Sequence, residues 1–140
     1  MSMETHVFFT GSLPGKADLE RRMVELGFPF RIVPPHDSLE AQNGYLPMTN
    51  GEAETGVEFD VFDGQSSFDD VGADPNLDRV ANFRWGSDYQ EAVAGMCGAA
   101  ALAGLVGGVV FDEAEDRLMS VEEATKLARE SLQVLASGKY

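Results

Sequence analysis

Twenty consecutive residues, 92–111, carry no charged or polar side chain. A segment of this length reaches the threshold for a helix that crosses a bilayer. However, it is rich in Ala and Gly, and its flanks carry Glu91 and Asp112 with no nearby Lys or Arg to anchor it at a membrane surface. Gly107–Gly108 followed by Val-Val-Phe favours a turn into a strand. The segment therefore predicts a buried helix followed by a buried strand, outside any membrane.

Apolar periodicity predicts the secondary structure on either side of this segment. Val57, Phe59 and Val61 alternate with acidic residues, so residues 55–62 are predicted to form a strand with one core face and one solvated face. Ser120 and Glu123 have the spacing of a capping box, which opens a helix. The same reasoning predicts strands at 6–10, 28–33, 44–49, 79–85 and 109–112, helices at 16–26, 121–135 and from a Ser87 cap to about 105, and a long loop at 63–78.

The order of these elements predicts one α+β domain that covers residues 1–140. Residues 6–33 have the order strand, helix, strand, which is just long enough for a crossover between two parallel strands. Residues 44–62 contain the favoured turn pair Asn50–Gly51 and are predicted to form a hairpin. We therefore expect a two-layer sandwich, in which three helices cover one face of a mixed sheet of about six strands.

The charge of the chain is concentrated in one region. Residues 32–78, here called the acidic segment, contain eleven Asp and Glu residues and no Lys or Arg. The whole chain has 24 acidic and 10 basic residues, a formal net charge of −14, and the residues outside the acidic segment hold 13 of those acids and all 10 bases. A field of one sign repels nucleic acid and anionic membranes and attracts basic partners.

Residues 11–16, Gly-Ser-Leu-Pro-Gly-Lys, lie between a predicted strand and a predicted helix, as a phosphate-binding P-loop does. Only three residues separate the two glycines where the motif needs four, and Ala17 replaces the Ser or Thr that would hold Mg²⁺. Both faults affect the mechanism, which needs a ring of N–H donors and a metal ligand. A Gly/Pro turn before a helix is the better interpretation.

The acidic segment also contains candidate cation ligands. An EF-hand frame with Gly64 at its sixth position would place Phe59 and Val61 where oxygen ligands are needed, so that motif fails. Carboxylates in the 63–78 loop could gather around Ca²⁺ or Mg²⁺ in a looser site, although solvated surface charge is their commoner role. These residues are Asp63, Asp69, Asp70 and Asp74.

The other reactive residue types give no recognisable catalytic site. His6 and His36 have no second His or Cys at ligand spacing, which argues against zinc. Residues 36–38 are His-Asp-Ser, but adjacent side chains cannot converge as a catalytic triad does. Cys97 lies in the apolar segment and is predicted to be a small buried side chain without nucleophilic character. No cofactor is implied.

Arg84 is predicted to lie on the strand face opposite Phe83 and Trp85. Two roles are compatible with this position. An internal ion pair would relieve repulsion within the acidic segment, worth about 0–1 kcal/mol if it is exposed. A contact with a partner is the alternative, because Trp and Arg are enriched at binding hot spots. We favour the ion pair.

The second half of the chain runs from Phe83-Arg84-Trp85-Gly86 to Gly108-Val109-Val110-Phe111-Asp112. In this run, in size and in acidity, the chain resembles the small acidic immunity proteins that bacteria make against their own basic toxins. The resemblance implies a non-catalytic protein that binds a basic partner. It is an analogy of general features, so it assigns no binding residues to this chain.

Two functions remain open, and a halophilic protein ranks below both because its acidity would be spread over the whole surface. The first is a non-catalytic, cytoplasmic binding domain, without nucleic acid or membrane as partner, that docks onto a basic protein. The single cysteine and the absence of a secretory signal in the first residues agree with this expectation. The second is a small enzyme, or a ligand- or metal-binding domain, with its site in loops 10–16 and 63–78. For the first function we expect the binding residues to be Glu58, Asp60, Asp63, Asp69, Asp70, Arg84 and Trp85.

Overall fold

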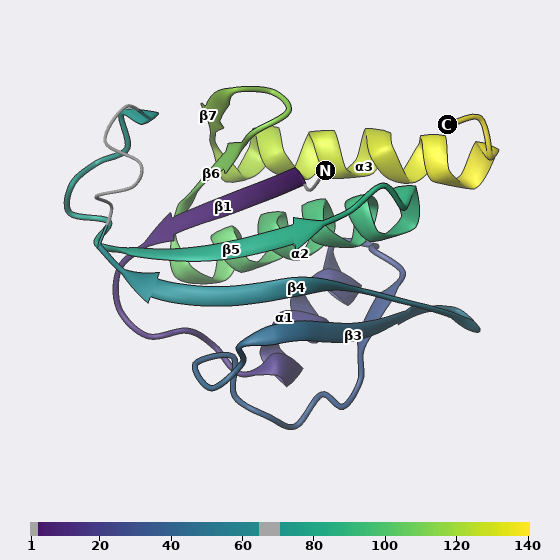
Figure 1. The fold of residues 1–140 in the computed structure, drawn as a ribbon, viewed down its shortest axis with the longest axis horizontal. Helices are drawn as coiled ribbons and strands as arrows, with labels where there is room; N and C mark the ends of the chain where they lie inside the picture. The colour runs from purple at the N-terminus through teal and green to yellow at the C-terminus, as the bar shows by residue number, and fades with distance from the viewer. Residues whose placement is uncertain (1–2, 65–70) are drawn as a thin grey trace.

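The computed structural model describes residues 3–64 and 71–140, and it contains seven strands and three helices within those ranges. Asp69 and Asp70, which we expected to bind a partner, therefore lie outside the described residues. The elements shown in Figure 1 are β1 (Met3–Phe9), α1 (Lys16–Glu25), β2 (Phe30–Ile32), β3 (Gly44–Asn50), β4 (Ala53–Asp63), β5 (Arg79–Trp85), α2 (Tyr89–Val106), β6 (Val109–Asp112), β7 (Arg117–Met119) and α3 (Val121–Ser137).

The strands form one sheet with the order β2-β3-β4-β5-β1-β6-β7, in which every neighbouring pair is antiparallel. Helix α2 packs across β1, β4 and β5, with α1 beside β2 and α3 beside β6 and β7 (Figure 1). The predicted two-layer α+β architecture is confirmed. The hairpin at 44–62 is confirmed as well, since β3 and β4 pair over seven residues. The sheet has more strands than expected because β7 pairs with β6 in a short hairpin.

The predicted parallel pairing of residues 6–10 with residues 28–33 is wrong, and the sheet is not mixed. Strand β1 lies between β5 and β6, whereas β2 pairs with β3 at one edge of the sheet. The physical reason is the length of the available partners. β5 offers seven paired residues to β1, while β2 is only three residues long. The longer antiparallel ladder supplies more backbone hydrogen bonds and more cross-strand side-chain contacts.

Glycines allow α2 to lie directly against the sheet. A Cβ atom at Gly95 would stand 2.5 Å from the ring atoms Cε3 and Cζ3 of Trp85, and one at Gly98 would stand 3.0 Å from Cε2 of Phe83. Helix α2 is long and apolar enough to cross a membrane by length and composition, and 56% of it is buried within this fold. The core helix of a soluble protein has the same character. The predicted buried helix followed by a strand is therefore confirmed.

The helix caps follow the sequence closely. Ser120 and Glu123 form the predicted capping box of α3, in which each side chain accepts a hydrogen bond from the backbone N–H of the other residue. At α2 the predicted Ser87 cap is wrong by one residue. The Asp88 carboxylate accepts the N–H of Glu91 at 3.1 Å instead. A carboxylate at this position also interacts favourably with the positive end of the helix dipole.

Candidate functional site

Strands β1, β4 and β5 carry three cross-strand rows on the sheet face that points away from the helices. Because Phe83 and Trp85 contact α2, the alternating residues of β5 must point to the opposite face. We call this the open face because α2 packs on the other side of the sheet, although His6, Asn82, Val80 and Phe8 on this face are buried. Its rows, read from β4 to β5 to β1, are Glu58–Arg84–Glu4, Asp60–Asn82–His6 and Phe62–Val80–Phe8. The first two rows are polar and the third is apolar.

The middle row is connected by hydrogen bonds. The side-chain N–H of Asn82 donates to Oδ1 of Asp60 at 2.8 Å, and Oδ1 of Asn82 lies 2.5 Å from Nδ1 of His6. An ionised carboxylate can only accept, so Asp60 fixes the orientation of the Asn82 amide. The oxygen of that amide then faces His6 and must accept a hydrogen bond from the protonated Nδ1. His6 is 2% exposed, which makes it a fixed part of the sheet.

Arg84 joins the two polar rows. Its guanidinium lies 3.4 Å from Oδ2 of Asp60 and 3.6 Å from Oε1 of Glu4. The predicted internal ion pair is therefore confirmed. The Arg84 side chain is 41% exposed, so these contacts contribute only about 0–1 kcal/mol to stability. Glu58 stands directly opposite Arg84 in the strand register, on the other side from Glu4.

A hollow of about 270 Å³ adjoins the first polar row. The Tyr45 ring, which is half exposed, lies against β4 because Gly56 has no side chain. A Cβ atom there would be only 2.6 Å from the ring atoms Cζ and Oη of Tyr45. We call this the acidic hollow, and it is lined by Tyr45, Gly56, Val57, Glu58, Arg84, Trp85, Gly86 and Glu91.

The carboxylates around the acidic hollow repel one another. Burial, followed by the charges of Asp88 and Glu58, raises the pKa of Glu91. Burial, followed by the charges of Glu91, Glu58, Glu54 and Asp88, raises the pKa of Tyr45. Within the described part of the chain, Glu54, Glu58 and Glu91 have no ion-pair partner. Arg84 also lines the hollow, but its guanidinium is held by Asp60 and Glu4, so these carboxylates repel one another without a paired cation among the described residues.

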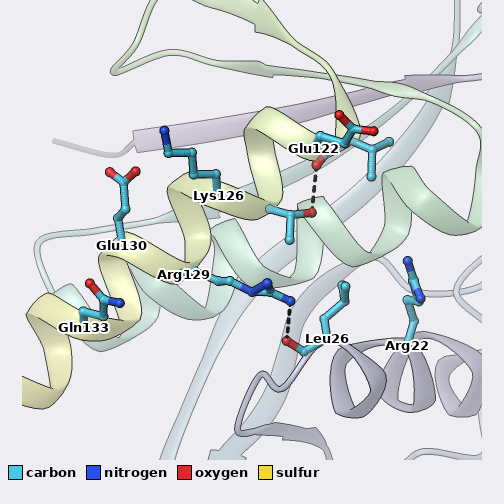
Figure 2. A pocket seen from close by; sticks show the side chains of 9 residues that line it. Arg22, Leu26, Glu122, Lys126, Arg129, Glu130 and Gln133 are labelled. Carbon is cyan, nitrogen blue, oxygen red and sulfur yellow. Dashed lines mark hydrogen bonds between the residues drawn. The ribbon is translucent and has the colours of Figure 1, made fainter.

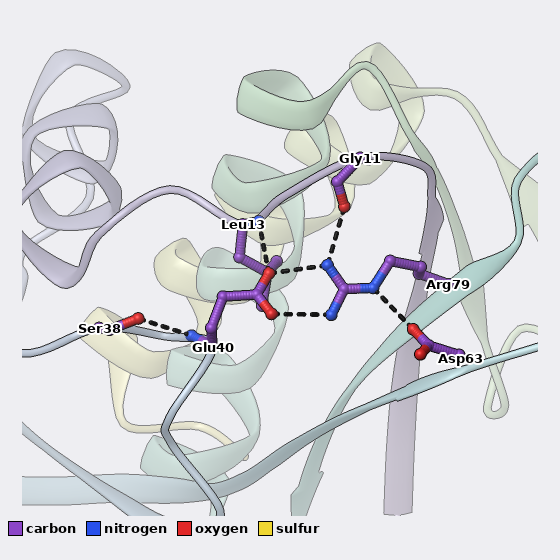
Figure 3. A network of polar contacts seen from close by, with 6 residues as sticks. All are labelled: Gly11, Leu13, Ser38, Glu40, Asp63 and Arg79. Atoms are coloured by element: carbon purple, nitrogen blue, oxygen red, sulfur yellow. Dashed lines mark hydrogen bonds and ion pairs between the residues drawn. The ribbon is translucent and has the colours of Figure 1, made fainter.

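The opposite end of β5 is neutralised internally, as Figure 3 shows. Arg79 donates two hydrogen bonds to the Glu40 carboxylate, at 2.7 and 2.8 Å, and one from Nε to Oδ1 of Asp63 at 2.9 Å. It also donates to the carbonyl oxygen of Gly11 at 2.8 Å. The Arg79 guanidinium and the N–H of Leu13 lower the pKa of Glu40 to about 2. We call these residues the Arg79 network.

Two other residues singled out by the sequence have internal roles. Lys16, at the end of the P-loop-like turn, is buried and lies 3.8 Å from Oδ2 of Asp37. Cys97 is buried in α2, and burial raises the pKa of its thiol. The thiol is therefore protonated near neutral pH and is a poor nucleophile.

A larger hollow, of about 520 Å³, lies between α1 and α3 (Figure 2). Arg129 crosses it and donates to the carbonyl oxygen of Leu26 at 2.8 Å. Its walls mix Arg22, Lys126 and Arg129 with Glu122 and Glu130, so it has no dominant sign of charge. The acidic hollow is the better candidate for binding a cationic group, because its carboxylates lie close enough to raise the pKa of Tyr45.

The structure brings four of the expected binding residues together around the acidic hollow and the open face: Glu58, Asp60, Arg84 and Trp85. Asp63 lies apart from them, in the Arg79 network. Sequence reasoning missed Glu91 and the His6–Asn82 contact. The hairpin signal at Asn50–Gly51 could have placed Tyr45 opposite Glu58, but nothing local to Glu91 brings α2 to this hairpin.

No protein-family model matches this chain, and neither does any curated protein. The geometry of the site must therefore carry the functional argument.

Proposed function

We propose that the protein is a non-catalytic binding domain that docks onto a basic partner protein through the acidic hollow and the adjoining row of Glu58, Arg84 and Glu4. The observation that carries this proposal is the group of carboxylates without ion-pair partners, Glu54, Glu58 and Glu91, around the half-exposed ring of Tyr45. A Lys or Arg side chain from a partner would donate charge-assisted hydrogen bonds to the carboxylates and make a cation–π contact with the ring.

The alternative, a small enzyme or ligand-binding domain with its site in loops 10–16 and 63–78, has less support. Several polar groups of these loops already have partners within the protein. Arg79 holds the Gly11 carbonyl and the Asp63 carboxylate, and Lys16 pairs with Asp37. A binding site would have to break these contacts before it could accept a ligand, whereas the acidic hollow has carboxylates ready for a cation.

An immunity-type role is one specific form of this function. The partner would then be a basic toxin, and the protein would act in the reducing cytoplasm, where a single buried cysteine needs no disulfide partner. Complementary charge would accelerate the association, and the acceleration would decrease as salt is added.

Affinity capture from the native organism, with three immobilised forms of the protein, tests the proposal. The forms are the wild type, the double variant Glu58→Gln/Glu91→Gln, and the control Glu122→Gln/Glu130→Gln, which changes the net charge equally on α3. We expect the wild type and the control to retain the same basic protein at low salt, and the hollow variant to lose it. Equal retention by both double variants, or retention that high salt does not reduce, would contradict a role for the acidic hollow.

A further inference from the structure

Three possible metal ligands meet where β1 passes β6. Glu4 and His6 are two residues apart on β1 and lie on the same face of the sheet, and Glu113 directly follows β6. The backbone N–H of Glu113 donates to the carbonyl oxygen of Glu4 at 3.2 Å, which fixes the end of β6 against β1. One ligand atom from each of the three side chains lies within 4.8 Å of the other two.

The hydrogen bond to Asn82 prepares His6 for metal binding. Since Nδ1 donates to Asn82, the neutral ring has its lone pair on Nε2, which lies on the side of Glu113. Metal-bound histidines usually donate their other ring N–H to a protein oxygen in this way, because the contact fixes the tautomer and the ring orientation. Asp60 completes the arrangement by holding the Asn82 amide.

The spacing between His6 and Glu113 is compatible with a direct contact and also with a metal ion held between the two side chains. Nε2 of His6 and Oε2 of Glu113 are 3.4 Å apart. A charge-assisted hydrogen bond would be shorter, about 2.7–2.9 Å. Two ligands on a tetrahedral ion with bonds of about 2.0–2.1 Å stand about 3.3–3.4 Å apart, so this separation suits an ion held between the two side chains.

The charge of the three ligands and their exposure to solvent also suit a divalent metal ion. The two carboxylates would neutralise a divalent ion, and the charge of Arg84, 3.6 Å from Glu4, is offset by Asp60 on its other side. The side chain of Glu113 is 41% exposed and that of Glu4 is 26% exposed, so an ion can reach the ligands from solvent.

We propose that Glu4, His6 and Glu113 bind a divalent transition-metal ion, with Zn²⁺ as the best fit. One imidazole and two carboxylates suit zinc, and they leave a fourth position for water or for a donor from another molecule. The sequence analysis argued against zinc because it looked only for ligands close to His6 along the chain. Here the fold brings Glu113 to His6 across 107 residues.

The test is a calorimetric titration of the chelator-treated protein with Zn²⁺ alone. We expect one ion per wild-type chain and an affinity at least about tenfold lower in Glu113→Gln and in His6→Gln. Glu115→Gln, in the same turn, and His36→Gln, at an exposed histidine, are controls that should bind as the wild type does. His6 is buried, so its variant could unfold. Glu113 is partly exposed, so its variant keeps the test decisive.

A nitrogen NMR spectrum of the His6 ring gives a second measurement. Zinc should shift Nε2 while Nδ1 remains protonated. Unchanged affinity in Glu113→Gln, or a wild type that takes up no stoichiometric zinc, would overturn the metal site. Either result would leave the proposed partner-binding function standing, because that function depends on the carboxylates of the acidic hollow.

Discussion

Two regions of the molecule, the Arg79 network and the acidic hollow, affect the pKa of their carboxylates in opposite directions. In the Arg79 network, one guanidinium binds Glu40 and Asp63, and the pKa of Glu40 falls to about 2. Around the acidic hollow, burial and neighbouring carboxylates raise the pKa of Glu91 instead. The two carboxyl groups are chemically identical. The difference arises because, in the part of the chain that the structure describes, Glu40 has a cationic partner and Glu91 has none. Arg79 pairs with Glu40, whereas Arg84, the cation beside the acidic hollow, pairs with Asp60 and Glu4.

This difference separates structural charge from charge that is available for binding. The Arg79 network ties four segments together, because it joins the turn after β1, the loop before β3, the end of β4 and the start of β5. The acidic hollow keeps its repulsion, which lowers the stability of the folded state. Sites that retain such unfavourable interactions commonly serve binding, where a partner relieves them.

The largest effect is expected from removing the cation. Arg79→Ala should lower the free energy of unfolding by about 2–3 kcal/mol, because the protein loses charge-assisted hydrogen bonds and leaves Glu40 and Asp63 without their counter-charge. Urea unfolding measures this loss. Arg21→Ala, which breaks an exposed pair with Asp18, is the control and should cost less than about 1 kcal/mol. Similar losses in the two variants would remove the contrast between structural and available charge.

The second-largest effect should be the contribution of the Glu40 charge to stability, which depends on pH. The folded pKa of Glu40, about 2, lies below the usual value of about 4.3, so its contribution is complete above the unfolded pKa and is lost as pH falls towards 2. Because Glu40 is partly exposed, Glu40→Gln should cost only about 1 kcal/mol at pH 6. Unfolding free energies measured between pH 6 and pH 2.5 should converge for the two proteins. A difference that stays constant with pH would show that the Glu40 charge is not responsible.

The smallest effect is expected from Glu91→Gln, which should increase the free energy of unfolding instead of lowering it. The pKa of Glu91 is raised in the folded state, so its ionisation destabilises the fold as pH rises above the unfolded value. Glu91→Gln should therefore be more stable than the wild type at pH 7, by roughly 0.5 kcal/mol, and equal to it below about pH 4. Thermal unfolding at the two pH values measures the change. A less stable variant at pH 7 would mean that the acidic hollow carries no net repulsion.

The sequence predicted those features that depend on local pattern. The alternation of Val57, Phe59 and Val61 identified β4, and the apolar segment after Glu91 identified α2 and β6. The pairing of strands that are distant in the sequence does not follow from local pattern, so it could not be predicted in this way. Residues 28–33 were assigned to the wrong partner, and β7, with three residues, was too short to show a period.

Prediction of the candidate site would have required the register of the strands and the packing of α2 against the sheet. Arg84 could be assigned to an ion pair because it alternates with Phe83 and Trp85, but its partners depend on the register of β5 with β1 and β4. The same register brings Asn82 between His6 and Asp60. Glu91 reaches the hollow from a different layer of the fold, which strand periodicity cannot indicate.

The position of β1 has a consequence for biosynthesis. This strand leaves the ribosome before either of its two partners, which begin at Arg79 and Val109. At about 5–20 residues per second, several seconds pass before β5 is available. During that time Val7, Phe8 and Phe9, all buried in the finished sheet, must remain without their native neighbours. Folding that depends on such distant contacts is slow, so a chaperone that shields the first strand should improve the yield of native protein.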